Sequence, residues 1–458
     1  MPKVCTIFSL LLALSKFLSI IRCNIPAEAQ GNAGTDKAAI YAFKEATIGM
    51  STSNGILREN RAAPGQNHDV VFVVRQRNRE KLKQILAEIS DPSRPNYGAY
   101  MSREEIADLT SDSKAHDAVM AHLVKAGAIV ISETSYGEHI TARAPVALWE
   151  MMFNTKFYTY AHIQGGSEKS PSSKFVRAER YSIPFDLDDH VESVFNTIQI
   201  PLIRKKVPMT RSSNSRNNLL ATAMGPITPA VLNKAYQVGS NVGSSRSIQA
   251  VFEAAGQYFS AKDLSTFQSK YSLPHLAVNM SLGNHSATSQ YCYQNSSSCS
   301  EGNLDVQYLM AISQSPTIYY YTNDYFSTFL LGVSNLKLLP LVVSISYGID
   351  EYFVPYSELD AFNFQAIKLG LMGVTITVSS GDDGANSDYA RNGPRNCGYS
   401  PSFPASSPYV LAVGATMVSN CENILNLRLN FTKNPPKITK YLESHQPKKR
   451  ALQTVPTM

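Results

Sequence analysis

The chain has 458 residues, of which 43% are hydrophobic and 17% are charged, and its formal net charge is +6. This length and hydrophobic content are enough to bury at least one full core, and the length indicates two or three domains. The charge excess is mild, and no basic helix carries interleaved aromatic residues, so the composition argues against a nucleic-acid-binding protein.

Residues 1–29 have the pattern of a secretory signal peptide. One positive charge precedes an apolar run that Lys16 interrupts. Ala27-Glu28-Ala29 offers a small-x-small cleavage site, with a cut near Cys23 as an alternative. The run is too short and too broken to predict a membrane span, and no later stretch reaches the roughly 18 apolar residues that a span requires. We therefore predict a protein of the secretory pathway without a membrane span.

Four cysteines remain once the two in the signal peptide are removed. An even set in a secretory protein predicts disulfides, and none of the four has the CxxC spacing of a zinc site. We pair Cys292 with Cys299 and Cys397 with Cys421, although four cysteines allow three connectivities. N-glycosylation sequons, which fit a secreted or lysosome-like glycoprotein, begin at Asn279, Asn284, Asn295 and Asn430.

Residues 30–66 are polar and small, which predicts a flexible lead-in. Residues 67–200 then show alternating strand and helix patterns, which predict an α+β domain. The expected elements are a strand at 69–74, helices at 79–89 and 114–126, strands at 128–132 and 139–142, a short helix after Pro145 and a strand at 156–160. This order is typical of a split βαβ, ferredoxin-like domain.

Residues 201–227 are rich in Arg, Ser and Asn, which predicts an exposed linker where a proprotein would be cut, or a plain flexible linker. In residues 228–416 apolar strands alternate with helices, as in a parallel sheet covered on both faces. We expect strands at 248–254, 276–280, 317–321, 341–347, 373–378 and 409–413, and helices at 304–313 and 357–371.

Glu301 and Asp305 lie four residues apart. On a helix this spacing places both carboxylates on one face, with Cβ atoms about 5–6 Å apart. Like charges at this distance raise one pKa and let the pair share a proton, as a catalytic acid–base pair would. Two acids at the start of a helix can also simply stabilise its N-terminal dipole.

Asp382 follows the apolar run 374–378 in a turn that reads Ser379-Ser380-Gly381-Asp382-Asp383. A buried parallel strand that stops at such a turn delivers a carboxylate to the carboxyl edge of its sheet. The alternative is an ordinary turn aspartate that caps backbone groups. We assign no role to Asp383, and Ser379 and Ser380 are expected to pack at the end of the strand.

Together these motifs resemble the sedolisin family of serine-carboxyl peptidases, of the tripeptidyl-peptidase I type. The acidic helix matches as E-x-x-x-D-x-Q-Y from Glu301, and the turn matches through Gly381-Asp382. The first domain resembles the family's activation propeptide through Asp91-Pro92-Ser93-x-Pro95-x-Tyr97-Gly98-x-Tyr100, and Thr228-Pro229-Ala230 resembles the start of the mature domain.

The resemblance implies a subtilisin-like α/β sandwich and a Ser-Glu-Asp catalytic triad. Glu301 would be the general base that activates the serine, Asp305 would orient and tune Glu301, and Asp382 would be protonated and stabilise the oxyanion. A carboxylate base has an intrinsic pKa near 4.3, so such a site favours acid. The implied partners are a peptide or protein substrate and the chain's own propeptide. The implied locations are a lysosome- or vacuole-like compartment and the extracellular space.

The sequence departs from the family pattern after Thr416. The family's nucleophilic serine lies in a Gly-Thr-Ser-Ala motif, and no Gly-Thr-Ser occurs in the 458 residues. The Ca²⁺ site expected for the family near its C-terminus should also be missing. Residues 417–458 read instead as a divergent tail, in which the basic and proline-rich stretches predict disorder.

Two function hypotheses remain at this point. The first is an acid-active serine-type peptidase made as a zymogen, which would release tripeptides from N-termini and is inactive without its serine. Endopeptidases share the same motifs. The second is a non-catalytic relative that binds or inhibits peptidases as a secreted protein.

Overall fold

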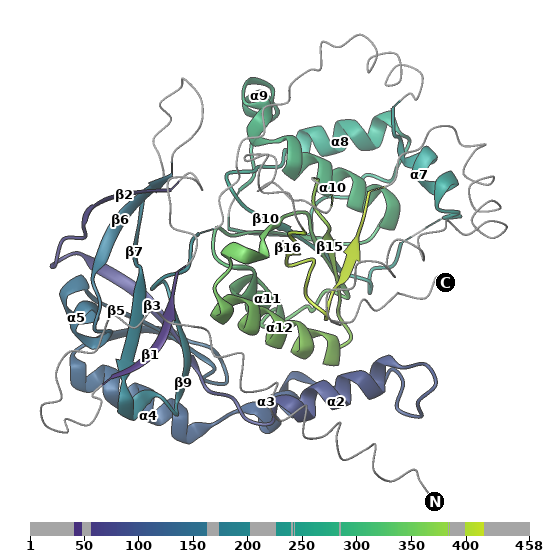
Figure 1. Cartoon of the computed structure of the whole chain (residues 1–458). Helices are drawn as coiled ribbons and strands as arrows, with labels where there is room; N and C mark the ends of the chain where they lie inside the picture. Colours follow the sequence, from purple (N-terminus) through teal and green to yellow (C-terminus); the bar gives the residue numbers. More distant parts are fainter. Residues whose placement is uncertain are drawn as a thin grey trace, which may run out of the picture. The chain divides into compact units, whose positions relative to one another are not determined.

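A computed structural model describes residues 41–47, 56–162, 174–201, 226–239, 241, 243–283, 285–382, 384 and 399–415. The predicted signal peptide, most of the predicted linker, the predicted tail 417–458 and the Cys397–Cys421 pair lie outside the described residues. None of the described helices combines the length and the hydropathy needed to cross a membrane. The described elements form one group before residue 201 and another after residue 226 (Figure 1).

The strands of the first group pair antiparallel. Their bounds are β1 (Tyr41–Ala46), β2 (Ile56–Arg61), β3 (Asn67–Val74), β4 (Ile129–Glu133), β5 (His139–Pro145), β6 (Phe157–His162), β7 (Lys174–Ala178), β8 (Arg180–Pro184) and β9 (Val191–Phe195). The order β4-β5-β3-β9 forms a four-stranded sheet, β2-β6-β7 a three-stranded sheet, and β1 pairs with β8. The helices of this group are α2 (Arg79–Ser90), α3 (Arg103–Thr110), α4 (Ser113–Ala126) and α5 (Val146–Met152), with a 3₁₀ turn η2 (Phe185–Leu187).

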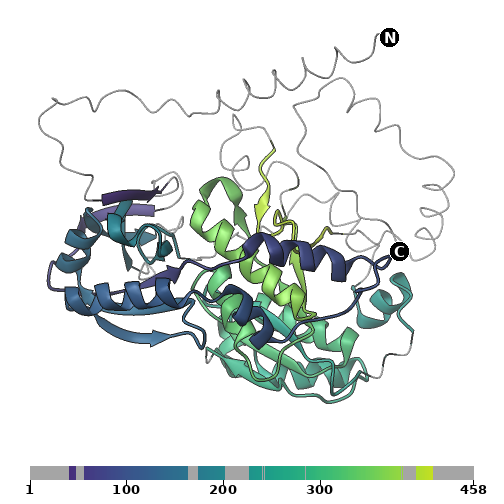
Figure 2. The ribbon, with the colours of Figure 1, turned by 90° about the horizontal axis from the view of Figure 1, so that it is seen from below.

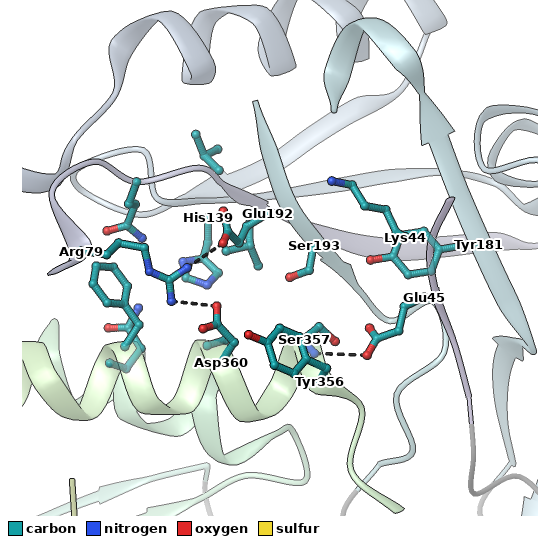
Figure 3. Close-up of a pocket in the computed structure, with 16 residues that line it drawn as sticks. Lys44, Glu45, Arg79, His139, Tyr181, Glu192, Ser193, Tyr356, Ser357 and Asp360 are labelled. Atoms are coloured by element: carbon teal, nitrogen blue, oxygen red, sulfur yellow. Dashed lines mark hydrogen bonds and ion pairs between the residues drawn. The ribbon is translucent and has the colours of Figure 1, made fainter. Parts of the chain in front are cut away.

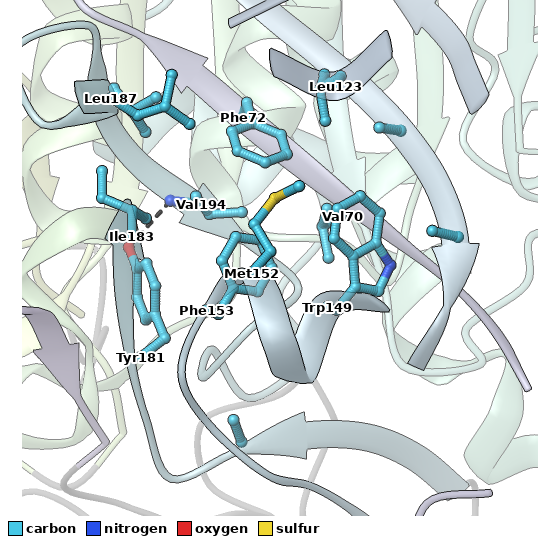
Figure 4. Close-up of a cluster of buried hydrophobic side chains, with 14 of the residues drawn as sticks. Val70, Phe72, Leu123, Trp149, Met152, Phe153, Tyr181, Ile183, Leu187 and Val194 are labelled. Atoms are coloured by element: carbon cyan, nitrogen blue, oxygen red, sulfur yellow. Dashed lines mark hydrogen bonds between the residues drawn. The ribbon is translucent and has the colours of Figure 1, made fainter. Parts of the chain in front are cut away.

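The core of the first group lies on one face of the four-stranded sheet (Figure 4). Residues i and i+2 of a strand share a face, and Val70 and Phe72 of β3 are both fully buried. Trp149 of α5 packs there and stacks on Phe153 at 5.5 Å. The α4 helix ends at Ala126, as predicted, and Gly127 with a φ of 80° provides a left-handed cap.

The structure corrects the predicted flexible lead-in 30–66. Within it, β1 pairs antiparallel with β8 and β2 pairs with β6. Ile56 and Ala62 are 4% and 3% exposed, so this stretch contributes to the buried interior. The prediction was wrong here because charged residues separate the few apolar side chains, and the pairing partners lie about 100 residues away or more.

The α2 helix uses its apolar face against the second group of elements. Leu82 and Ile89 on this face are buried. They pack on Phe364, Ile367 and Leu371 of helix α12 (Tyr356–Leu371). The two helices lie alongside one another (Figure 1 and Figure 2). The α3 helix, which was not predicted, begins with a capping box between Ser102 and Glu105.

The second group contains a six-stranded parallel sheet in the order β11-β12-β10-β13-β15-β17. Its strands are β10 (Gln249–Glu253), β11 (Met280–Leu282), β12 (Thr317–Tyr321), β13 (Val342–Ile345), β15 (Thr375–Ser379) and β17 (Leu411–Val413). A short antiparallel pair joins β14 (Ile349–Asp350) to β16 (Ser402–Phe403). The other helical elements are α7 (Pro229–Ala235), α8 (Ala261–Lys270), α9 (Ser289–Gln294), η3 (Ser296–Ser298), α10 (Ser300–Ser313), α11 (Phe326–Ser334) and η4 (Glu351–Phe353).

Helices cover both faces of this sheet, as predicted. Phe252 of β10 joins a core with residues of α11 and α12, whereas its neighbour Val251 joins a core with residues of α8 and α10. A fully buried parallel strand requires this division, because its side chains alternate between two covered faces. The parallel sheet is therefore confirmed. The subtilisin-like and ferredoxin-like assignments stay predictions.

Two local predictions had different outcomes. The strand expected at 276–280 begins later, as β11 at the edge of the sheet. The disulfide between Cys292 and Cys299 is present, with Cα atoms 5.4 Å apart, and it closes the turn between α9 and α10.

Candidate active site

The carboxyl ends of the parallel strands bring three polar side chains to one edge of the sheet. Glu253 is the last residue of β10, Tyr347 follows β13 after one residue, and Asp382 follows β15. Because β13 lies between β10 and β15, the backbones at the ends of these two strands are about 10 Å apart. This edge is where ligands bind in open α/β sheets.

The N-terminus of α10 carries Glu301 to the same edge. Its backbone N–H donates to Oε1 of Gln257, which follows β10, at 3.1 Å. A Cβ at Gly302 would lie 2.5 Å from the carbonyl oxygen of Tyr258, so only glycine allows this approach of the helix. Glu301 and Asp305 lie on the same helix one turn apart, as predicted.

Glu253 joins these two acids, and the sequence reasoning missed it. Its side chain is fully buried, and the Tyr347 hydroxyl donates to its Oε2 at 2.7 Å. Burial, followed by the charge of Asp305, raises the pKa of Glu253 well above its ordinary value, and the charge of Glu301 adds to this. Its Oε1 meets no hydrogen-bond donor among the described residues, which suits a proton held between Glu253 and Asp305.

The Tyr347 hydroxyl is kept protonated by the same surroundings. Burial, together with the charge of Glu253, raises the pKa of the phenol. It therefore remains a hydrogen-bond donor to Glu253 over the whole working range of an acid or neutral enzyme. A signal for Glu253 was present in the sequence, because Gln249-Ala250-Val251-Phe252-Glu253 is an apolar run that ends in an acid, as the strand before Asp382 does.

Asp382 lies at the same edge as the acid cluster but on its own turn. The turn begins at Gly381, whose φ of 91° favours glycine, and the Asp382 side chain is exposed. The structure thus brings Glu301 and Asp305 together with Glu253, and it places Asp382 two strands away in the sheet order. The catalytic roles predicted for Glu301, Asp305 and Asp382 stay predictions.

A metal site is not built by the described side chains. Within the described ranges, no group of three or more His, Cys, Asp or Glu residues could hold a metal ion. Calcium expected from the family's C-terminal residues stays a prediction.

Comparison with known proteins supports the resemblance seen in the motifs. The family named "Pro-kumamolisin, activation domain" matches residues 54–200. Physarolisin from Physarum polycephalum is 29% identical over 399 residues, covering 81% of this chain and 64% of its own length. Tripeptidyl-peptidase 1 from Mus musculus is 29% identical over 377 residues, covering 79% of this chain and 63% of its own. The chain thus spans less than two thirds of the length of these relatives.

A solved structure gives a more limited match. Pseudomonas sedolisin, a serine-carboxyl proteinase complexed with two molecules of pseudo-iodotyrostatin, aligns with 41% of this chain and 52% of its own. The identity is 23% and the TM-score is 0.33, an overlap too small to support a comparison of folds. The activation-domain match and the curated relatives carry the resemblance instead. The chain is thus similar to the sedolisin family, of the tripeptidyl-peptidase I type.

Proposed function

We propose that this protein is the zymogen of an acid-active serine-type peptidase, with residues 41–201 as its activation propeptide. The observation that carries this proposal is the cluster of Glu253, Glu301 and Asp305 at the carboxyl edge of a parallel sheet. Burial and the charges of Asp305 and Glu301 raise the pKa of Glu253, so this cluster favours a bound proton. A structural ion pair joins opposite charges, whereas this cluster brings acids together and raises the pKa of one of them. The cluster is therefore suited to proton transfer.

Each acid has a distinct proposed role. Glu301, at the first turn of α10, is the general base that takes the proton of a serine hydroxyl. Asp305, one turn further along α10, orients Glu301. Glu253, held by the Tyr347 hydroxyl, shares a proton with Asp305 and so keeps that proton in place. Asp382 donates a hydrogen bond to the oxyanion when it is protonated. All of these roles are filled best below neutral pH.

The nucleophile is the missing component. No Gly-Thr-Ser occurs in residues 1–458, and we propose that these residues alone do not hydrolyse peptides. Two of the relatives are named as tripeptidyl-peptidases, which favours release of tripeptides as the activity. The Cys292–Cys299 disulfide supports an oxidising secretory compartment, and the acid chemistry favours an acidic one.

The decisive experiment begins with the transcript. Sequencing across the codons after Thr416 shows whether a Gly-Thr-Ser-Ala motif is encoded downstream. The encoded protein is then assayed at pH 4.5 on an unblocked peptide, beside its Glu301→Gln variant and an exposed control, Glu80→Gln. We expect tripeptide release that Glu301→Gln abolishes and Glu80→Gln preserves. Equal activity of all three proteins would exclude Glu301 as the base.

A second candidate function is a secreted peptidase inhibitor. It is favoured by the extensive contact that the propeptide region makes with α12, through Arg79, Glu45 and Glu138. The 458-residue protein would then slow an active sedolisin without cleaving peptides itself. Absence of inhibition at equimolar and tenfold excess, tested at both neutral and acid pH, would rule this function out.

A further inference from the structure

One face of α12 contacts the propeptide region through a stripe of residues. Ser357, Asp360, Phe364 and Lys368 follow one another at intervals of three or four residues, so they line one side of the helix. We call these four residues the α12 stripe. The groups that contact the stripe alternate in charge along the helix, from Glu45 through Arg79 to Glu138. Such a pattern makes the stripe a surface that recognises a particular partner.

The first contact is at the N-terminus of α12. Pro355 provides no side-chain cap there, and Glu45 of β1 supplies one by accepting from the Ser357 N–H at 3.2 Å. One turn further, Arg79 of α2 donates to Asp360 at 2.7 Å and lies 4.4 Å from the centre of the Phe364 ring. The same guanidinium bonds Glu192 of β9 at 2.6 Å (Figure 3).

The last contact is a buried ion pair. Lys368 Nζ donates to Glu138 at 2.5 Å and to Oε1 of Gln76 at 2.6 Å. Lys368 and Glu138 are 4% and 9% exposed, so the pair is strongly shielded from water. Removing the propeptide region would leave the Lys368 ammonium without Glu138.

His139 lies directly after Glu138 and is 8% exposed. It lines a cavity of about 140 Å³ between β1, β9, α2 and α12 (Figure 3). Its Nδ1 is buried and has no hydrogen-bond partner among the described residues, and the same is true of Oε1 of Gln365 across the cavity. The imidazole is therefore packed into the contact with no hydrogen bond to its Nδ1, and the neighbouring Glu138 charge only partly offsets its burial.

The charged groups around His139 come from several of the elements that line the cavity, whereas β3 and β8 contribute only uncharged side chains. The charged groups are Lys44 and Glu45 of β1, Arg79 of α2, Glu192 of β9 and Asp360 of α12, together with the Glu138–Lys368 pair. Arg79 is engaged by Glu192 and Asp360, Lys44 by Asp188, and Glu138 by Lys368. The nearby carboxylates are thus already engaged, apart from Glu45, which caps α12.

The titratable groups of this contact respond to acid with different signs. Burial raises the pKa of Glu45, so its contribution is greatest below its ordinary value and diminishes as pH rises. The pKa of Glu138 is lowered because Lys368 outweighs its burial, so its contribution is lost only in stronger acid. Burial lowers the pKa of His139 to about 4 although the charge of Glu138 opposes this, and Lys368 lowers it further, so its contribution is lost between about pH 6.5 and 4.

We propose that His139 is the acid sensor of the α12 stripe, and that its protonation places a second cation beside Lys368 and loosens the propeptide region from α12. This inference rests on the proposed function, in which residues 41–201 act as a removable propeptide. It assigns the response in mild acid to one imidazole rather than to the more numerous carboxylates.

The test uses the 458-residue protein and its His139→Asn and His139→Gln variants, which keep a polar side chain but do not titrate. Amide exchange in α12 and β5 is followed by mass spectrometry from pH 7 to pH 4 and corrected for intrinsic exchange rates. The wild-type protein should lose protection of α12 by about a hundredfold over this range, as expected from a pKa lowered from 6.5 to about 4. Both variants should lose less than a tenth of that.

His116→Asn is the matched control, because this histidine contacts Glu133 and Asp117 in the propeptide region instead of α12. It should keep the wild-type response. A full response in both His139 variants would overturn the proposal. Its loss in His68→Asn alone would also overturn it, since His68 is a partly buried histidine whose pKa is lowered as well. Limited tryptic cleavage in the linker distinguishes a failure of the His139 sensor from a failure of the proposed function. Fragments that part already at pH 7 would contradict a bound propeptide, whereas fragments that stay together at pH 4 would contradict only the sensor.

Discussion

Two buried clusters of ionisable groups differ in the charges that they bring together. At the carboxyl edge of the parallel sheet, Glu253 lies with two other acids, and falling pH relieves their mutual repulsion. At the α12 stripe, Lys368 needs an ionised Glu138 and a neutral His139, so falling pH weakens the contact. The same acidification therefore favours the acid cluster and disfavours the propeptide contact. The zymogen proposed above would need both responses to stay inactive until it meets acid.

The largest predicted effect comes from removing the charge that faces Lys368. Glu138→Gln leaves a buried ammonium without its counterion, which should lower the free energy of unfolding by about 3–5 kcal/mol at pH 7. Urea unfolding of the 458-residue protein measures this. Combining the change with Lys368→Met should restore most of the loss, because the double variant buries no unpaired charge.

An exposed ion pair provides the control for that prediction. Arg58 and Glu179 form a pair whose side chains are about half exposed, and Glu179→Gln should change stability by less than about 1 kcal/mol. Equal effects of Glu138→Gln and Glu179→Gln would show that the pair at α12 is solvated in solution.

The next effect concerns how the acid cluster is positioned. Gly302→Ala would put a Cβ 2.5 Å from the Tyr258 carbonyl oxygen and push the first turn of α10 outward, together with Glu301. We expect a loss of about 1–3 kcal/mol in the free energy of unfolding, measured by urea unfolding. Gly65→Ala is the control, because nothing lies within 4 Å of a Cβ at that position. A Gly302→Ala protein as stable as Gly65→Ala would indicate that α10 has room to move.

Features set by local patterns were predictable from the sequence. The helix that ends at Gly127 and the turn closed by Cys292 and Cys299 depend on residues near one another in the chain. The parallel sheet followed from apolar strands that alternate with helices. The pairing of Glu301 with Asp305 followed from the helical period alone.

Features set by distant contacts were not predictable in the same way. The apolar stripe of α2 was visible, but its partner Phe364 lies about 280 residues further along the chain. The β1 strand is recognisable only through its pairing with β8. Glu253 was missed because an acid at the end of an apolar strand becomes significant only when the fold brings α10 beside it.

A smaller effect tests the shared proton of the acid cluster. Because the folded state raises the pKa of Glu253, its protonated form contributes stability that is complete below its ordinary value near 4.5 and declines as pH rises. Glu253→Gln is always neutral and should be more stable than wild type by about 1–2 kcal/mol at pH 7, with no difference at pH 4. Thermal unfolding between pH 4 and pH 8 measures this. Parallel curves for the two proteins would mean that Glu253 does not titrate in this range.

The smallest effect separates the two glutamates of the propeptide contact. Glu45→Gln keeps an oxygen that accepts from the Ser357 N–H and removes only the charge, whose burial raises the pKa of Glu45. We expect a change within about 1 kcal/mol at pH 7, measured by urea unfolding, and none at pH 4, because the wild-type carboxyl is then protonated as well. Glu45→Ala removes the acceptor too and should cost about 1 kcal/mol at both pH values, as the loss of a helix cap does. A loss with Glu45→Gln as large as with Glu138→Gln would show that the cap depends on its charge, and the contact would then have two acid-sensitive points instead of one.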